Sequence, residues 1–562
     1  MKRKRYGLTS TMIFMLLLAL TLSGSNTRVA NAASPKRPKL VLVLISDGFR
    51  ADYLDRFGDL FGKRGLKRLM TKGAWFTNAE YGYSTTYTAV GHSAILSGAG
   101  PGLSGLVAND WYDRKTDSRV YCVEDPSTKF YAGGKKKIKK HAGSSPRNFN
   151  GTTVGDELLL SNSFQSKVIS ISVKDRGAIL TGGKLGKSFW YSSSSGKFVT
   201  SQYYYKQNPK WLDAFNAQKL AASYFGKEWK LLRPASAYAR SARDDRKYET
   251  NYKGVGLTFP HKLTSGLEKP GKNYFKMLRF TPFGDKVTLG LVKKAVVAEK
   301  LGQRGVTDLL SVSFSSVDYV GHAFGPYSVE MQDTVLRLDR TVADLFKFLD
   351  KKVGMKNVLV MMTADHGMAP ISEYMQEFGV DAGRINPKDM AKGIDNALDK
   401  AFGPDDWVAA WWNPNVYLKL DTIRKKKLNP TDVENVAARF LLTYPGVANV
   451  FTRTQLVNGT VTKSEQGRKM MAAFNVARSG DVFVVQKPYW YLFAAPLQYG
   501  TTHGSPYDYD TRVPIIFMGA GVKAGRYSTK ASVYDIAPTL ATLIRVSTPS
   551  LSVGRVLHEG LK

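Results

Sequence analysis

The feature that most limits how this chain can fold is a series of apolar runs, each next to a turn that carries an acid, a cation or a histidine. The runs occupy residues 40–45, 168–173, 309–314, 358–362 and 513–518. Apolar, β-branched runs of this length are typical of strands buried on both faces of a parallel sheet. The carboxyl ends of parallel strands meet at one edge, so polar residues far apart in sequence can gather there.

Helical stretches separate these runs. Residues 329–349, which follow Pro326, repeat apolar side chains at helical spacing, and residues 536–544 form another such stretch. The alternation predicts an α/β fold with a mostly parallel central sheet and helices on both faces. Two regions, at about 185–290 and 370–495, break the alternation. We interpret them as inserted cap and α+β subdomains of a single domain that spans residues 33–562.

The first 32 residues are typical of a secretory signal. Four basic residues precede a short apolar run at 12–22, and Ala30-Asn31-Ala32 fits a cleavage site. A run of this length is too short for a bilayer core of about 30 Å. We therefore expect an exported protein, periplasmic or secreted, without a transmembrane segment in the mature chain; an uncleaved anchor is the alternative. Cys122 is the sole cysteine, which excludes an intramolecular disulfide.

The chain is strongly basic. Its 81 Lys and Arg against 46 Asp and Glu give a formal net charge of +35. Such a field attracts anionic substrates and polyanions, and it also suits adsorption to an anionic envelope surface. We find no nucleic-acid-binding motif, so we expect no specific nucleic-acid partner.

Acids and histidines cluster in the turns beside the apolar runs. They are Asp47, Asp318, His322, Asp365, His366 and His503. Carboxylate and imidazole groups in such sets suit a pair of divalent metal ions. Asp318 and His322 are spaced i, i+4, so on one helical turn they face the same way. We interpret the remaining histidines, which are His92, His141, His261 and His558, as structural or exposed.

A threonine lies at the start of a short predicted helix that Gly98 ends. A helix N-terminus offers free N–H donors, which suits a phosphoryl group, and a hydroxyl on a divalent metal becomes a nucleophile. Thr88 is placed for this role. It is equally placed for an ordinary N-cap, and Thr85 and Thr86 compete for either role, so the physics of the sequence leaves all three open.

Two further segments carry groups that suit an anion. Lys174-Asp175-Arg176 ends the second apolar run, and its two cations could clamp a dianionic phosphate; a surface ion-pair loop is the alternative. Asn109 could donate its amide to an oxyanion.

In combination these motifs resemble the alkaline phosphatase superfamily, and within it the type I phosphodiesterase/nucleotide pyrophosphatase branch. The matching segments begin at Asp47 (DGFRAD), Thr88 (TAVGH), Gly105 (GLVANDW), Asp318 (DYVGH), Ala364 (ADHGM) and His503 (HGSPYDYDTRVP). The resemblance covers most of the chain. It implies an alkaline-phosphatase-like fold with two Zn²⁺ ions.

The resemblance also implies a role for each site residue. One zinc would be held by Asp318, His322 and His503, and the other by Asp47, Asp365 and His366, with Thr88 bridging as the nucleophile. Asn109 would hold a phosphate oxygen. Lys174 and Arg176 resemble the pair found in family members that are phosphate monoesterases, and Ala89 stands where diesterases place an aromatic.

The function that follows is an exported two-zinc alkaline phosphatase acting on small phosphate monoesters through a phosphothreonine on Thr88. The alternative is a phosphodiesterase/nucleotide pyrophosphatase or phosphonate hydrolase that uses the same metals. A non-enzymatic alternative is a basic envelope-binding protein with structural metals.

Overall fold

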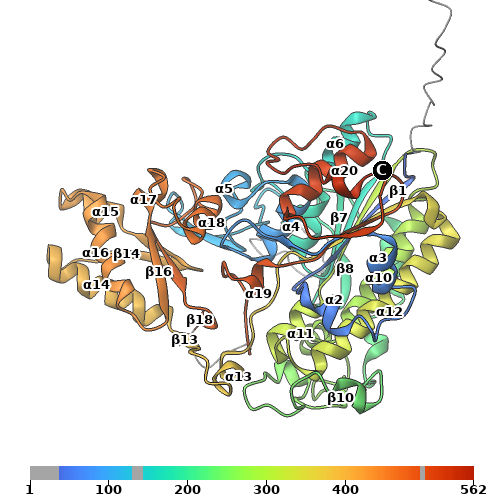
Figure 1. Ribbon diagram of the computed structural model, residues 1–562, viewed down its shortest axis with the longest axis horizontal. Coiled ribbons are helices and arrows are strands. Elements are labelled where there is room, and N and C mark those ends of the chain that lie inside the picture. The colour runs from blue at the N-terminus through green and yellow to red at the C-terminus, as the bar shows by residue number, and fades with distance from the viewer. Residues whose placement is uncertain (1–36, 129–142, 494–499) are drawn as a thin grey trace, which may run out of the picture. The chain divides into compact units, whose positions relative to one another are not determined.

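The computed structural model describes residues 37–128, 143–493 and 500–562. The predicted signal segment, residues 1–32, lies outside the described residues. Within the described ranges, no helix is both long enough and apolar enough to cross a bilayer. Helices and strands carry the labels of Figure 1.

Within the described residues, a nine-stranded sheet forms the centre of the fold, in the order β20-β2-β19-β12-β1-β11-β6-β7-β8 (Figure 1). Its edge strand β20 is Gly525–Tyr527. Its middle strands are β12 (Val358–Thr363), β1 (Leu40–Ser46), β11 (Asp308–Phe314) and β6 (Val168–Ser172). These strands are parallel to one another, and each is buried along its whole length. Full burial is what a strand covered on both faces requires. The predicted mostly parallel sheet is confirmed.

The last predicted strand runs the other way. β19 (Ile515–Met518) pairs antiparallel with β12 and with β2 (Ala74–Phe76). Because β19 is reversed, its beginning lies at the edge where the parallel strands end. His503, which precedes β19, is thereby brought to the same edge as the acids that follow β1, β11 and β12.

Helices cover both faces of the sheet, as predicted (Figure 1). One group contains α4 (Thr88–Ser97), α6 (Val154–Ser161), α7 (Asp175–Gly182) and α20 (Ile536–Ile544), which contact one another. The other contains α3 (Leu66–Lys72), α10 (Phe283–Ala298), α11 (Ser316–Phe324) and α12 (Val329–Lys352). The side chain of Ser328 caps α12 by accepting from the N–H of Met331, which satisfies one of the free donors at a helix start.

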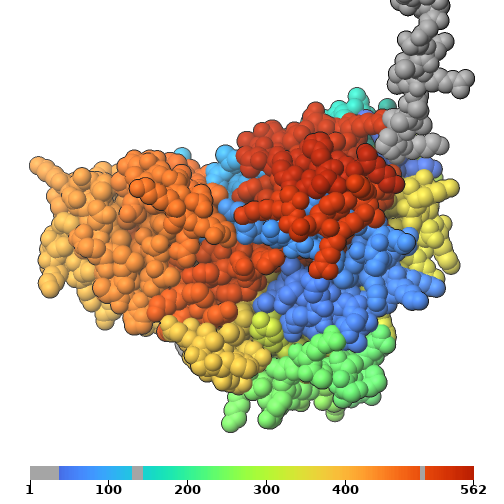
Figure 2. All heavy atoms as spheres, viewed as in Figure 1, coloured from blue at the N-terminus to red at the C-terminus, as the bar shows by residue number. Residues whose placement is uncertain are grey.

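A four-stranded sheet, in the order β14-β15-β17-β16, is formed by later residues of the described chain. Its strands are β14 (Val408–Trp412), β15 (Asn415–Leu418), β16 (Val447–Thr452) and β17 (Val482–Gln486), and its helices are α14 (Pro387–Phe402) and α16 (Pro430–Leu442). They enclose a separate cluster of buried apolar side chains that includes Ile394, Trp407 and Leu441, and they form a contiguous block of surface (Figure 2).

The first predicted insertion, at about residues 185–290, begins inside the central sheet. β7 (Lys187–Ser192) and β8 (Lys197–Val199) extend the central sheet beyond β6, and Phe189 belongs to the main core. The irregular part of this segment therefore begins after Val199. The boundaries of both insertions stay predictions.

Candidate active site

The turn after β1 places the first acid. Asp47 is fully buried, and its N–H donates to the carbonyl of Phe314 at 2.8 Å. Gly48 adopts a φ of +73°, and a Cβ there would lie 2.9 Å from the Cα of Asp318. Its N–H donates to Oδ1 of Asp365 at 3.1 Å. The glycine thus allows three acids from three strand ends to approach one another.

Asp318 and the two histidines predicted beside it come together. On α11, Oδ1 of Asp318 lies 3.4 Å from Nε2 of His322 and 3.6 Å from Nε2 of His503. The other ring nitrogens face the backbone: Nδ1 of His322 lies 2.9 Å from the carbonyl of Thr501, and Nδ1 of His503 lies 2.7 Å from that of Thr86. Such contacts fix the imidazoles with Nε2 toward the acid, as in metal sites.

Asp365 and His366 follow β12 directly. Nε2 of His366 lies 3.3 Å from Oδ2 of Asp365 and 3.5 Å from Oδ1 of Asp47. The ring of His366 stacks on that of His503, with centroids 3.5 Å apart. Helix α4 approaches this turn closely, since a Cβ on Gly91 would lie 2.0 Å from the carbonyl oxygen of Asp365. The two predicted ligand sets are therefore adjacent.

The donor set fits divalent metal ions. Oδ2 of Asp47, Oδ1 of Asp318 and Oδ2 of Asp365 are buried and accept no well-formed hydrogen bond within the described structure. Nζ of Lys174 lies 2.9 Å from Oδ2 of Asp47 and Nδ1 of His92 lies 3.1 Å from Oδ2 of Asp365, but three clustered carboxylates remain costly unless further cations compensate them. Ligand atoms of Asp318, His322 and His503 lie within 4.8 Å of one another, which is the first predicted set.

The second set is grouped differently from the prediction. Within the described residues, ligand atoms converge as Asp47–Asp318–His366 and as Asp47–His92–Asp365. Asp318 therefore contributes ligand atoms to two clusters, one with His322 and His503 and one with Asp47 and His366. Burial raises the pKa of Asp47 well above its usual value, and the charges of Asp318 and Asp365 raise it further.

Lys174 offsets part of this negative charge. Its Nζ lies 2.9 Å from Oδ1 of Asp47 and 2.5 Å from Oδ2 of Asp318. Burial lowers the pKa of Lys174, but the two carboxylates outweigh burial and raise it above its usual value.

The geometry distinguishes the three threonines. Thr88 is the first residue of α4 and Tyr87 is its N-cap, so Thr88 is not the cap. Its Oγ1 lies 3.4 Å from Nε2 of His366 and accepts from Nζ of Lys174 at 3.1 Å. The hydroxyl of Thr86 donates instead to the carbonyl of Ser505 at 3.0 Å, and Oγ1 of Thr85 is buried without a hydrogen-bond partner among the described residues.

Arg176 contacts the same hydroxyl, and Asn109 contacts the residue that follows Thr88. Nη2 of Arg176 donates to Oγ1 of Thr88 at 3.4 Å, and its Nη1 donates to the hydroxyl of Tyr121 at 3.3 Å. Oδ1 of Asn109 accepts from the N–H of Ala89 at 3.0 Å. Because the oxygen of this amide is engaged at the start of α4, its NH₂ is the group that remains for an anion.

His92 is a site residue that the sequence reasoning did not select. It is fully buried on α4, and its Nδ1 lies 2.9 Å from the carbonyl of Thr88 and 3.1 Å from Oδ2 of Asp365. Its Nε2 lies 2.8 Å from Oγ of Ser313. The available signal was its i+4 spacing from Thr88, which puts both residues on one face of α4.

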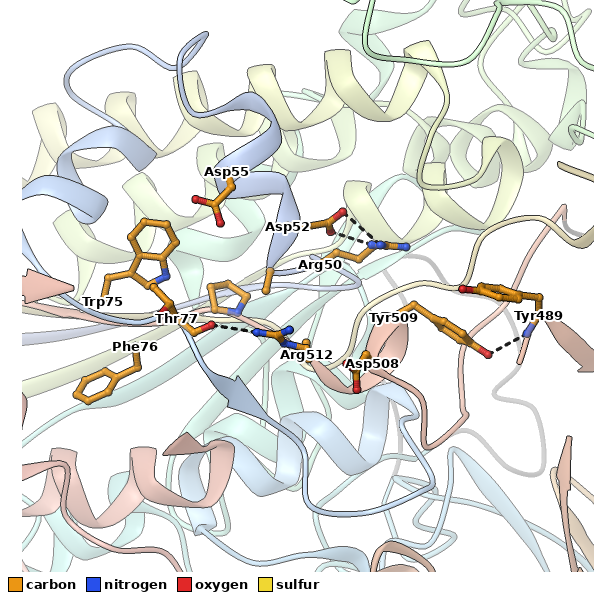
Figure 3. A pocket seen from close by; sticks show the side chains of 12 residues that line it. Arg50, Asp52, Asp55, Trp75, Phe76, Thr77, Tyr489, Asp508, Tyr509 and Arg512 are labelled. Atoms are coloured by element: carbon orange, nitrogen blue, oxygen red, sulfur yellow. Dashed lines mark hydrogen bonds and ion pairs between the residues drawn. The ribbon is translucent and has the colours of Figure 1, made fainter. Parts of the chain in front are cut away.

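A pocket of about 370 Å³ lies outside this cluster (Figure 3). Arg50 and Arg512 supply its cations, but Arg50 donates to both oxygens of Asp52 and Arg512 donates to the carbonyl of Thr77. None of the described residues that line this pocket is a predicted metal ligand. The carboxylate and histidine cluster, not this pocket, therefore carries the groups suited to chemistry.

A protein-family model described as type I phosphodiesterase / nucleotide pyrophosphatase matches residues 41–506. This range includes every predicted metal ligand. The chain belongs to this family.

Two curated relatives and one solved structure define its place in the family. Alkaline phosphatase PhoV of Synechococcus elongatus is 38% identical over 532 residues, covering 94% of this chain and 93% of that protein. Alkaline phosphatase PafA of Elizabethkingia meningoseptica is 36% identical over 546 residues, covering 97% and 98%. The crystal structure of wild-type PafA matches with a TM-score of 0.85 at 35% identity, covering 94% and 99%. The alkaline-phosphatase-like fold is thereby confirmed.

Proposed function

We propose that the protein is an exported two-zinc alkaline phosphatase that hydrolyses small phosphate monoesters through a phosphothreonine on Thr88. The observation that carries this proposal is that Oγ1 of Thr88 meets Lys174, Arg176 and His366 at once. A buried hydroxyl bordered by two cations and a metal-type donor set is placed to attack a bound phosphoryl group. The names of PhoV and PafA support the same function.

The family resemblance supplies the assignment of metal ligands, while in the structure Asp318 also joins Asp47 and His366. Asp318, His322 and His503 would hold one zinc, and Asp47, Asp365 and His366 would hold the other together with Thr88. Bound there, the ions would lower the pKa of a coordinated hydroxyl and neutralise charge on the transferring group.

The chain's own groups account for the remaining steps. Lys174 and Arg176 would bind the equatorial phosphoryl oxygens, with the NH₂ of Asn109 as a further donor. Oγ1 of Thr88 would attack phosphorus in line with the leaving oxygen, and the bond to the alcohol would break as the phosphothreonine forms. Water would then attack phosphorus from the vacated side, releasing phosphate and restoring the hydroxyl of Thr88.

Removing the cations tests whether they recognise a dianion. In Lys174→Ala and Arg176→Ala we expect kcat/KM for an aryl phosphate monoester to fall about 10- to 100-fold each, the value of a charge-assisted hydrogen bond. The matched aryl diester has one fewer charge to pair, so its turnover should fall less. Lys184→Ala, which removes a lysine away from the cluster, is the control. Equal losses on both esters would contradict the monoesterase assignment.

The same assay addresses the alternative of a diesterase or phosphonate hydrolase. Ala89, the residue after the nucleophile, is fully buried in an apolar cluster. No aromatic ring is presented at that position for stacking a nucleobase. A diester preference of the wild-type protein would favour the alternative.

His92 is expected to support the metal rather than the phosphate. His92→Phe removes its contacts with Asp365 and Thr88, and loss of such a supporting group typically lowers metal affinity about 10- to 100-fold. Competition with a chromophoric chelator measures this affinity directly. At saturating zinc, kcat should recover to within a few-fold of wild type. A kcat that stays low despite full zinc occupancy would assign His92 to the reaction itself.

A further inference from the structure

A pocket of about 360 Å³ opens beside Lys174 and Arg176. Its other walls include Trp190, the serines at and just after the end of β7, Arg279 and Tyr319. Neither the proposed attack on phosphorus nor the metal sites involve these other walls. Because two phosphate-binding cations line the pocket, an ester bound by them would project its remaining half into this space.

Positive charge dominates the lining of this pocket. Lys174, Arg176 and Arg279 are its cations, and Asp175 is the one carboxylate among the described residues that line it. Oδ1 of Asp175 already accepts from the hydroxyl of Tyr121 at 2.7 Å and from the N–H of Arg176 at 2.8 Å. The surplus of cations predicts that an anionic group is favoured here.

Arg279 lies on the wall away from the phosphate clamp. Across the described residues no carboxylate forms an ion pair with it; its Nη1 donates to the hydroxyl of Tyr319 at 2.8 Å and its Nε to the carbonyl of Lys276 at 3.3 Å. Lys276 and Lys272 add further positive charge to the same segment. A half-buried guanidinium held only by neutral oxygens retains donors for an anionic ligand.

One aromatic ring links the two cationic walls. The centroid of the Tyr319 ring lies 5.2 Å from Nζ of Lys174 and 4.7 Å from Cζ of Arg279. Tyr319 directly follows the predicted metal ligand Asp318 on α11. The cations are therefore separated by no more than these two distances together, a span that a compact leaving group can bridge.

We propose that Arg279 binds a second anionic group, a carboxylate or a phosphate, on the leaving-group half of the substrate. The physiological substrates would then be phosphate monoesters that carry another negative charge near the ester. This inference rests on the proposed phosphatase function and deepens it. Tyr319 holds the guanidinium in place, and the Ser192 and Ser193 hydroxyls border the same space.

A matched pair of substrates tests the inference. meta-Carboxyphenyl phosphate and meta-carbamoylphenyl phosphate have nearly the same shape, and only the first carries a second anion. We expect zinc-loaded wild-type protein to prefer the carboxylate by roughly tenfold in kcat/KM, the value of one charge-assisted hydrogen bond. Arg279→Met should abolish this preference and leave turnover of the carbamoyl ester within about threefold, and Arg279→Lys should retain part of it.

Control variants distinguish a direct contact of Arg279 with the substrate from the general electrostatic field of the basic segment around it. Lys276→Met removes a cation from the same segment that does not line the pocket, so the preference should survive. The inference is overturned if wild type shows no preference, if Arg279→Met keeps it, if that variant loses both substrates equally, or if Lys276→Met loses it as well. Failure of wild type to hydrolyse either ester would instead contradict the phosphatase function. Repeating the comparison with aryl bisphosphates distinguishes carboxylate from phosphate selectivity.

Discussion

Thr88→Ala is expected to reduce phosphate release from a monoester by about 10⁴-fold or more, because loss of a nucleophile removes the covalent route altogether. The variant should still fold and bind zinc, since the change removes only one hydroxyl and one methyl group at the start of α4. Steady-state release of phosphate measures the loss. In acid-quenched wild-type reactions, mass spectrometry should find phosphate on the peptide that contains Thr88.

Neighbouring hydroxyls supply the matched controls. Thr88→Ser keeps an oxygen at the same position and should retain much of the activity. Thr85→Val replaces a buried hydroxyl that has no hydrogen-bond partner among the described residues, so activity and stability should change little. Activity that survives Thr88→Ala, or phosphate found on Thr85, would place the nucleophile elsewhere.

Removing the metals is expected to abolish activity and to destabilise the fold. Each site filled at about 100 to 1,000 times its dissociation constant contributes about 3 to 4 kcal/mol to the free energy of unfolding. Dialysis against a chelator should therefore lower the melting temperature, and zinc alone should restore both activity and melting temperature. If full activity persists after complete metal removal, the two-metal assignment is wrong.

The variant Asp47→Asn tests how one metal ligand affects stability with and without metal. Burial and two neighbouring acids raise the pKa of Asp47 well above its usual value. The ionised carboxylate therefore lowers the free energy of unfolding of the metal-free protein. A raised carboxyl pKa means that stability falls as pH rises through the folded-state pKa. The neutral amide should therefore leave the metal-free protein as stable as wild type or more stable at alkaline pH, while the response to zinc shrinks. A metal-free variant less stable than metal-free wild type would contradict this account.

Much of the fold and most of the residues at the site were predictable because their signals are local. An apolar run buried on both sides, such as β1, is visible within a few residues, and so is the Asp-Gly turn that ends it. The Asp318/His322 spacing likewise needs only one turn of helix. These short patterns are enough to predict that the ends of the parallel strands lie at one edge of the sheet.

Other features depend on contacts between distant segments. The reversed direction of β19 comes from its pairing with β12, which no local pattern encodes. The choice of Thr88 over Thr86 depends on where Ser505 and Lys174 lie, and the link between His92 and Asp365 depends on how α4 packs. Arg279 belongs to no recognisable sequence motif, and only the folded structure places it in a pocket with Lys174.

The hydrogen bond between His503 and the carbonyl of Thr86 joins residues 417 positions apart. Closing such long loops is slow compared with forming helices and hairpins, because the chain loses entropy before the distant contacts form. The donor set is therefore completed only after His503 is synthesised and β19, which follows it, has docked on the sheet. Metal capture would come at the end of folding in this protein, unlike in small domains where the ion nucleates the structure. A nascent or truncated chain that lacks His503 would thus lack one ligand of the first ion, so occupancy of that site reports whether His503 has reached the strand ends.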